Sequence, residues 1–396
     1  MQKWLGAVVL FLLFGALSAQ VVYKTGSEIT VGAGRYEVFK PDIDGKSIAV
    51  CANHTSMVDS VHLVDFLLSK GHGVVKVFSP EHGFRGVAGA GEAIEDQIDT
   101  KTGLPVISLY GKNKKPTAAD LAGIDVVIFD IQDVGARFYT YISTLYLLME
   151  ACAENDVELI VLDRPNPNGF YVDGPVLESQ FKSFVGMLPI PVVHGMTVGE
   201  LARMINGEGW LQNSVKCDLK VVPCLHYLRN NIYVLPVSPS PNLRNMNAVL
   251  LYPSLCFFEG TQVSVGRGTD HPFECFGHPN FTQGNFVFVP KSTEGAPHPK
   301  HEGVPCVGWD LRQFGGNRVV EKQHMILDWL VNAYRDFPDK GDFFLKNGFF
   351  DKLAGTDQLR KQIEAGMSAE EIRATWQADL NRFKKQRQPY LIYDES

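Results

Sequence analysis

The stretch VVIFDIQDVGARFYTYISTL, residues 126–145, holds three different patterns in succession. Residues 126–129 form a continuous apolar, β-branched run, which is typical of a strand covered on both faces. Residues 130–137 carry a cluster of polar side chains that includes Asp130, Asp133 and Arg137. From residue 138 to 155 apolar side chains recur at helical spacing. The stretch therefore predicts a buried strand, a polar loop and a helix, which together form one unit of an α/β fold.

The same unit recurs through the first two thirds of the chain. The expected strands are residues 47–51, 74–78, 106–109, 126–129, 159–162 and 192–193, and the expected helices are 57–68, 138–155 and 197–206. The last helix opens with Thr197 and Glu200 at capping-box spacing. This alternation predicts an α/β, doubly wound parallel sheet.

From about residue 237 the pattern changes. The turn-rich SPSPN, residues 238–242, precedes a segment rich in aromatic residues, Gly and Pro. Helices are expected at 318–334, 359–365 and 369–385, the last capped by Ser368 with Glu371 at its third position. We therefore expect a catalytic domain over residues 20–240 and a smaller α+β domain over 241–396.

The composition is that of a globular protein large enough for two domains. The chain has 396 residues, of which 45% are hydrophobic and 20% are charged. The formal net charge is −7, and the few basic clusters are not interleaved with aromatic residues. We therefore expect no nucleic-acid partner.

The N-terminus has the pattern of a secretory signal peptide. Lys3 precedes an apolar run, and small residues follow at 16–19, so cleavage is expected near Ser18 or Ala19. The run is shorter than the roughly 20 residues of a membrane span. We expect a signal peptide over residues 1–19, a periplasmic or secreted protein, and no stable membrane span after cleavage. Of the seven cysteines, Cys217 and Cys224 could form a disulfide in that compartment.

Polar residues gather where the expected strands end. They are Asn53 and His54 after the first strand, Glu81 and His82 after the second, Asp130, Asp133, Arg137 and Tyr139 after the fourth, Asp163, Arg164 and Asn168 after the fifth, and His194 after the sixth. In open α/β sheets, ligands bind beyond the carboxyl ends of the strands. The clusters therefore predict a pocket at this edge.

Each residue also has a structural interpretation. Asp130 and Asp163 could cap the following helices, and Arg137 and Arg164 could form ion pairs with them. His54, His194 and Tyr139 could belong to the core. The coincidence of all five clusters favours a functional site and leaves the individual roles open.

The residues of this edge suit a sugar better than a nucleotide. Residues 50–58 contain no glycine, so the dinucleotide fingerprint is absent, as are a P-loop, a Gly-x-Ser-x-Gly elbow and His-Glu-x-x-His. A metal site built from His54, His82 and Asp130 remains open, but we expect no metal and no cofactor. Carboxylates, aromatic rings and arginines are the groups that hydrolyse and hold an anionic saccharide.

Long strings of the sequence resemble a known family. They include FSPEHGFRG, TGLPVISLYG, PTAADLAGIDVVIFDIQDVGARFYTYISTL, LDRPNPNG, VDGPVLE, HGMTVGELA, EGTQVSVGRGTDHPFE and LAGTDQLRKQIEAGMSAEEIRATW. In these strings the chain resembles the exo-β-N-acetylmuramidases of glycoside hydrolase family 171. This family was long catalogued as a domain of unknown function. Two departures are Val87, where the family pattern has Asp, and residues 292–303, which match nothing and are expected to form a variable surface loop.

The resemblance implies a Rossmann-like N-terminal domain, a smaller C-terminal domain and a site in the cleft between them. It implies release of N-acetylmuramic acid from the non-reducing end of peptidoglycan-derived saccharides. Glu92 and Glu81 flank a glycine-bearing loop at the carboxyl edge of the expected sheet, so we take them as the leading catalytic carboxylates, with His82 and Asp130 as further catalytic candidates.

The expected substrate-binding residues are Asn53, His54, Asp133, Arg137, Tyr139, Asp163, Arg164, Asn168, His194 and Arg267. Arg137, Arg164 or Arg267 should grip the lactyl carboxylate of the muramic acid. The alternative is a non-catalytic periplasmic muropeptide or sugar-binding protein. The sequence leaves open which carboxylate is the acid, and whether the reaction is retaining, inverting or substrate-assisted.

Overall fold

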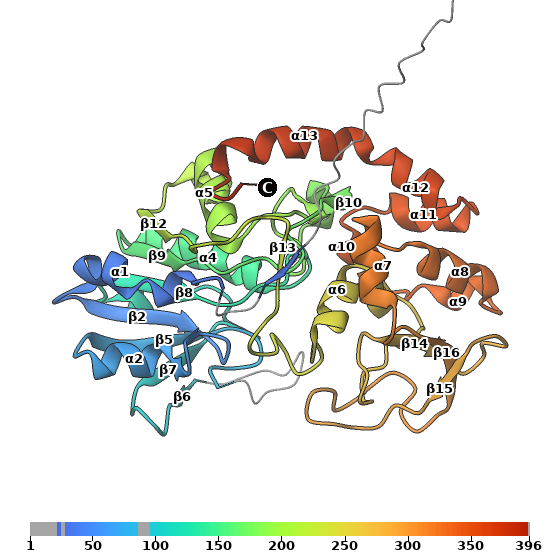
Figure 1. Cartoon of the computed structure of the whole chain (residues 1–396), viewed down its shortest axis with the longest axis horizontal. Coiled ribbons are helices and arrows are strands. Elements are labelled where there is room, and N and C mark those ends of the chain that lie inside the picture. Colours follow the sequence, from blue (N-terminus) through green and yellow to red (C-terminus); the bar gives the residue numbers. More distant parts are fainter. Residues whose placement is uncertain (1–21, 25–27, 86–95, 395–396) are drawn as a thin grey trace, which may run out of the picture.

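A seven-stranded sheet with helices on both faces forms the first part of the molecule, and a smaller second domain follows (Figure 1). The structure is a computed structural model that describes residues 22–24, 28–85 and 96–394. The strand order is β12-β9-β8-β2-β5-β7-β6. In chain order these strands are β2 (Ser47–Ala52), β5 (Gly73–Ser79), β6 (Gln97–Ile98), β7 (Pro105–Ser108), β8 (Val126–Asp130), β9 (Glu158–Leu162) and β12 (Leu219–Val222).

The sheet is doubly wound, as the sequence predicts. The chain runs outward from β2 through β5 to β7, then returns to β8 on the other side of β2 and continues through β9 to β12. All of these pairs are parallel, and only the short edge strand β6 runs antiparallel. The direction of winding reverses between β2 and β8, which is where open α/β sheets form their ligand crevice.

Both faces of the sheet are buried, which explains the continuous apolar runs. Cys51 and Phe129 belong to one hydrophobic core, which includes residues of helices α4 (Tyr141–Glu154) and α5 (Val198–Glu208). Their neighbours Val50 and Ile128 belong to the opposite core, together with residues of α1 (Tyr36–Ile43) and α2 (Leu63–Ser69). The capping box of Thr197 and Glu200 at the start of α5 is confirmed.

One expected strand lies outside this sheet. Residues 192–193 fall in β11 (Pro191–Val193), which pairs antiparallel with β10 (Asp173–Val176) in a separate two-stranded sheet. Pro191 has no amide hydrogen to donate, so it suits a short pair better than the interior of a ladder. The sixth parallel strand is instead β12, which the sequence analysis missed.

The helix expected at 57–68 is also shorter than predicted. Its first half is a hairpin of β3 (Met57–Val58) and β4 (Val61–His62), and only α2 is helical. Asp59 turns the chain with a φ of 52°, and the His62 ring accepts a hydrogen bond from Val64 N at the start of α2. A residue with positive φ cannot continue a right-handed helix, which is why the pattern fails here.

The second domain contains a three-stranded antiparallel sheet and a series of short helices. The sheet has the order β14 (Cys275–His278), β16 (Cys306–Asp310), β15 (Phe286–Phe288). The helices are α6 (Met246–Leu255), α7 (Gly315–Lys322), α8 (Asp328–Asp336), α9 (Lys340–Phe343), α10 (Phe349–Ala354), α11 (Gln358–Glu364), α12 (Ala369–Thr375) and α13 (Gln377–Arg387).

Two helices predicted to be continuous are each divided. The segment 318–334 is split between α7 and α8, because Gln323 is left-handed with a φ of 51°. The segment 369–385 is split between α12 and α13 at Trp376, and the capping box of Ser368 and Glu371 is confirmed.

The C-terminal segment returns to the first domain. Helix α13 crosses back towards α5 (Figure 1), and Arg387 Nη1 donates to the carbonyls of His194 and Gly195 at 3.0 and 2.7 Å. Tyr393 Oη donates to Asp163 Oδ2 at 2.6 Å. The last residues of the chain therefore contact the sheet domain directly.

The remaining sequence predictions concern the cysteines and the N-terminus. All seven cysteines, including Cys217 and Cys224, are free thiols. Within the described part of the chain, no helix is both long and apolar enough to cross a membrane. The expected signal peptide over residues 1–19 lies outside the described residues.

Candidate active site

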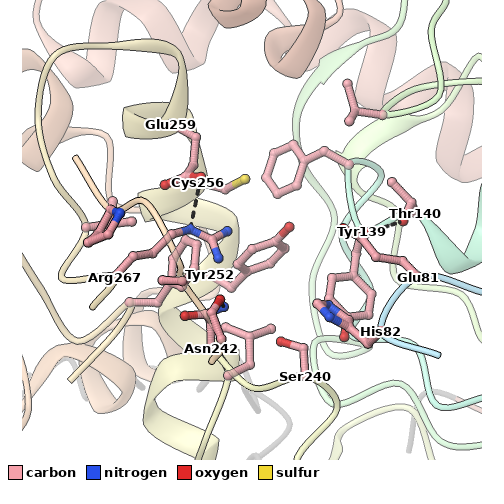
Figure 2. A pocket seen from close by; sticks show the side chains of 18 of the residues that line it. Glu81, His82, Tyr139, Thr140, Ser240, Asn242, Tyr252, Cys256, Glu259 and Arg267 are labelled. Atoms are coloured by element: carbon pink, nitrogen blue, oxygen red, sulfur yellow. Dashed lines mark hydrogen bonds and ion pairs between the residues drawn. The ribbon is translucent and has the colours of Figure 1, made fainter. Parts of the chain in front are cut away.

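A cavity of about 680 Å³ lies between the carboxyl edge of the sheet and the second domain (Figure 2). Residues from both the first and the second domain line the cavity. From the sheet side come Glu81, His82, Tyr110, Phe138, Tyr139 and Thr140, and from the other side come Asn242, Tyr252, Cys256, Glu259, Arg267, Phe273 and residues 295–300. We call this space the active-site cavity.

Glu81 and His82 follow β5 and form one wall of the active-site cavity. Thr140, at the start of α4, donates from Oγ1 to Glu81 Oε2 at 3.0 Å. Burial, together with the charge of Glu81, raises the pKa of the Tyr110 hydroxyl. His82 has a φ of 70°, which is costly for a residue with a side chain, and backbone strain of this kind clusters at functional sites. The sheet edge therefore presents a carboxylate and an imidazole to the cavity.

Arg267 lies on the facing wall (Figure 2). Its Nε contacts Glu259 Oε2 at 3.1 Å, and its guanidinium carbon lies 4.9 Å from the ring centre of Phe273. Burial lowers the pKa of Arg267, but the charge of Glu259 more than offsets this and holds the pKa above its usual value. The terminal nitrogens of Arg267 make no hydrogen bond to any residue that the structure describes, so a cation faces the cavity with donors available.

Aromatic rings line the space between the two walls. Tyr252 contacts Tyr139 and Phe273 edge-on, with ring centres 5.6 and 5.0 Å apart. The Tyr139 hydroxyl donates to the Pro239 carbonyl at 2.8 Å. These contacts hold the rings in place, and such rings can stack on the apolar face of a sugar.

The segment 292–303, expected as a variable surface loop, contributes a wall of the cavity instead. Lys300 Nζ donates to the carbonyls of Phe258, Glu259 and Thr261 at 2.9, 3.1 and 2.7 Å. Asn242 Nδ2 donates to the Gly295 carbonyl at 2.7 Å. The segment is a loop, as expected, but these bonds hold it against the cavity. Their acceptors are backbone carbonyls, which leave no mark in the sequence, so this role could not be predicted.

Four of the predicted charged residues lie in the interior. Arg164 donates from Nε and Nη2 to the two carboxylate oxygens of Asp130 at 2.6 and 2.9 Å. Arg137 donates to the carbonyls of Pro175, Ile190, Leu353 and Ala354, and burial lowers its pKa to about 9. Asp163 accepts hydrogen bonds from Thr197, Gly199 and Tyr393, and burial raises its pKa to about 6. None of the four lines the active-site cavity.

The remaining predicted binding residues, other than Tyr139 and Arg267, also lie outside the cavity lining, where they are buried or hydrogen-bonded within the protein. Burial and the nearby arginines lower the pKa of His194 to about 3, and burial raises that of Asp133 to about 7. Asn168 Nδ2 donates to the carbonyls of Val134 and Val249, and Asn53 Oδ1 accepts from Thr55. The ring of His54 hydrogen-bonds the Ser238 carbonyl at 2.8 Å.

Of the predicted site residues, the structure brings together Glu81, His82, Tyr139 and Arg267 in one cavity. Glu92 lies outside the described residues. In the described ranges no three His, Cys, Asp or Glu side chains are placed to hold a metal ion, so His54, His82 and Asp130 do not form the metal site considered above.

Sequence analysis missed several residues of the cavity, among them Tyr110, Asn242, Tyr252 and Glu259. Tyr110 follows β7, so the same argument from strand ends would have found it. The others come from α6 and the loops around it, where no regular pattern indicates which side chains face the sheet edge.

Two family models match the chain in succession. The N-terminal and C-terminal models of Exo-beta-N-acetylmuramidase NamZ match residues 48–247 and 250–393, respectively. The chain belongs to this family. Its sequence is 41% identical to the peptidoglycan beta-N-acetylmuramidase NamZ of Bacillus subtilis strain 168 over 380 residues, which cover 90% of this chain and 89% of that protein.

Two solved structures of DUF1343 family proteins from Bacteroides fragilis have the same fold. The first is 49% identical with a TM-score of 0.86, and the second is 28% identical with a TM-score of 0.78. Each match covers 93% of this chain and 99% of the other. The α/β sheet and the smaller second domain are therefore shared with these two proteins.

Proposed function

We propose that the protein is an exo-acting glycoside hydrolase that releases N-acetylmuramic acid from the non-reducing end of peptidoglycan-derived saccharides. Membership of the NamZ family supports this function. The observation that carries it is the placing of Glu81 and Arg267 on facing walls of one aromatic-lined cavity. Most glycoside hydrolases use carboxyl groups to break the glycosidic bond, and a muramic acid carries a carboxylate for the arginine to bind.

Glu81 is the proposed acid/base carboxylate. Its hydrogen bond from Thr140 orients the carboxyl group, and His82 beside it supplies a second titratable group. Glu92, eleven positions further along the chain, is the proposed second carboxylate. A separation of about 5–5.5 Å between two such carboxyl groups gives retention and about 6.5–9.5 Å gives inversion.

Arg267 is the proposed ligand of the lactyl carboxylate. Of the three candidates, Arg137 and Arg164 have guanidinium groups engaged by backbone carbonyls and by Asp130, respectively, and neither lines the cavity. Arg267 uses Nε for Glu259, which orients the planar group and leaves the terminal nitrogens for a bidentate contact.

Incubation of the purified protein with a short saccharide that ends in N-acetylmuramic acid tests this function. We expect free N-acetylmuramic acid, with or without EDTA. Release that EDTA abolishes would contradict the metal-free mechanism. Binding of the saccharide without release would support the alternative, a non-catalytic muropeptide-binding protein.

We further propose that the protein acts in the periplasm or outside the cell, after removal of a signal peptide over residues 1–19. The support is the sequence pattern of a basic start, an apolar run and small residues at 16–19. Mass spectrometry of the protein from the native host tests this. An intact Met1 in the mature protein would contradict it.

A further inference from the structure

A second, smaller hollow lies on the second domain, beside helix α8. Its volume is about 150 Å³, and its lining residues are Phe281, Thr282, Gln283, Trp309, Ala333 and Asp336. It shares no lining residue with the active-site cavity. We call it the Trp309 groove.

Trp309 is unusually exposed for its position. It lies on β16, the central strand of the three-stranded sheet, directly opposite Phe276 of β14. Paired residues of antiparallel strands share a face, and Phe276 is buried there against the ring of Phe258, 4.8 Å away. Trp309 nevertheless keeps 40% of its surface exposed, and its indole N–H donates to none of the described residues.

The floor of the groove is held firmly. Phe281 is buried, and its ring lies 6.1 Å from that of Phe337 and 5.8 Å from that of His278. Ala333, on α8, is also buried. An apolar floor beside an exposed indole therefore exists without any rearrangement.

The rim of the groove is polar. Thr282 and Gln283 lie in the loop between β14 and β15, and Asp336 ends α8. The side chain of Gln283 makes no hydrogen bond within the described part of the chain. Asp336 contacts Arg335 at 3.2 Å, in an ion pair exposed to water. An amide, a hydroxyl and a carboxylate thus surround two aromatic side chains.

We propose that the Trp309 groove binds one pyranose ring of a glycan strand, as a second site apart from the active-site cavity. A pyranose has an apolar face of C–H groups, which packs on an indole, and a periphery of hydroxyl and amide groups, which bond to a polar rim. A cavity of this volume accepts one six-membered ring. The choice of a glycan as ligand rests on the proposed function.

A second glycan site would act by keeping the enzyme near its polymer. While one ring is held in the Trp309 groove, strand ends nearby reach the active-site cavity at a raised effective concentration. The benefit applies to insoluble peptidoglycan and is lost on a short soluble substrate, which has no further strand to hold.

Co-sedimentation with purified insoluble peptidoglycan tests the proposal, with excess free N-acetylmuramic acid present to fill the active-site cavity. We expect Trp309→Ala to weaken binding about three- to tenfold, and Trp309→Phe to retain most of it. Phe314→Ala is the matched control, because Phe314 is exposed on the same domain but lies outside the groove, and it should bind as the unaltered protein does.

The measured quantity is the fraction of protein bound to peptidoglycan, not the release of product, so failure of this proposal can be told apart from failure of the proposed catalytic function. Unchanged binding by Trp309→Ala would overturn the proposal. An equal loss for Phe314→Ala would overturn it too, because the effect would then be general surface adhesion. A change of oligomeric state in Trp309→Ala with glycan binding intact would show a contact between copies of the protein instead.

Discussion

Two groups of charged residues near the carboxyl edge of the sheet differ in their surroundings. The interior group, Asp130, Arg137, Asp163 and Arg164, is at most 4% exposed and makes its hydrogen bonds to other parts of the protein. The cavity group, Glu81, His82 and Arg267, lines a space open to a ligand. In the sequence the two groups look alike, since most of these residues follow strands of the same sheet.

The difference shows what determines the role of a charged side chain. A buried charge whose partners are all within the protein stabilises the fold, and its loss leaves an uncompensated group behind. A charge that lines a cavity can interact with a substrate. Variants in the two groups should therefore differ in whether stability or activity falls.

Glu81→Gln should give the largest loss of activity. Gln can still accept the hydrogen bond from Thr140 but cannot transfer a proton. We expect turnover of a chromogenic N-acetylmuramide to fall about 10²- to 10⁴-fold with little change in melting temperature. Glu302→Gln, at an exposed position that does not line the cavity, is the control. Near-normal turnover of Glu81→Gln would remove this residue from the mechanism.

Asp130→Asn should instead reduce stability. It would leave the buried guanidinium of Arg164 without its bidentate carboxylate. We expect the free energy of unfolding to fall by about 3–5 kcal/mol, as measured by urea denaturation. A fully stable variant with abolished turnover would instead place Asp130 in the cavity group.

Asp133→Asn should make stability depend less on pH. Burial raises the pKa of Asp133 from 3.8 to about 7, so the folded state favours its protonated form. The stability that this preference contributes is present below about pH 4 and is lost as the pH rises through 7. Between pH 5 and pH 8 the variant should gain on the order of 2–3 kcal/mol relative to the unaltered protein. If the difference in the free energy of unfolding between the variant and the unaltered protein were the same at both pH values, the assignment would be contradicted.

The sequence predicted most of the sheet but only part of the site. Continuous apolar runs marked β2, β5, β7, β8 and β9, because strands buried on both faces need them. The sequence could not show that Arg164 is an ion-paired interior residue whereas Arg267 lines the cavity. The partner of Arg164, Asp130, lies 34 positions away in the chain, so local sequence does not reveal the pair. Tyr252 and Glu259 were missed because the packing of the second domain brings them to the cavity.

The most direct test of the division into an interior group and a cavity group uses two variants, Arg267→Gln and Arg137→Lys. For each, the ratio of kcat/KM for an N-acetylmuramide to kcat/KM for an N-acetylglucosaminide is measured. The two sugars differ in the lactyl carboxylate, so a residue that binds it should set this ratio. We expect Arg267→Gln to lower the ratio about 10- to 100-fold, and Arg137→Lys to lower the melting temperature while the ratio stays intact. An unchanged ratio in Arg267→Gln, or a ratio that falls with Arg137→Lys, would contradict the account.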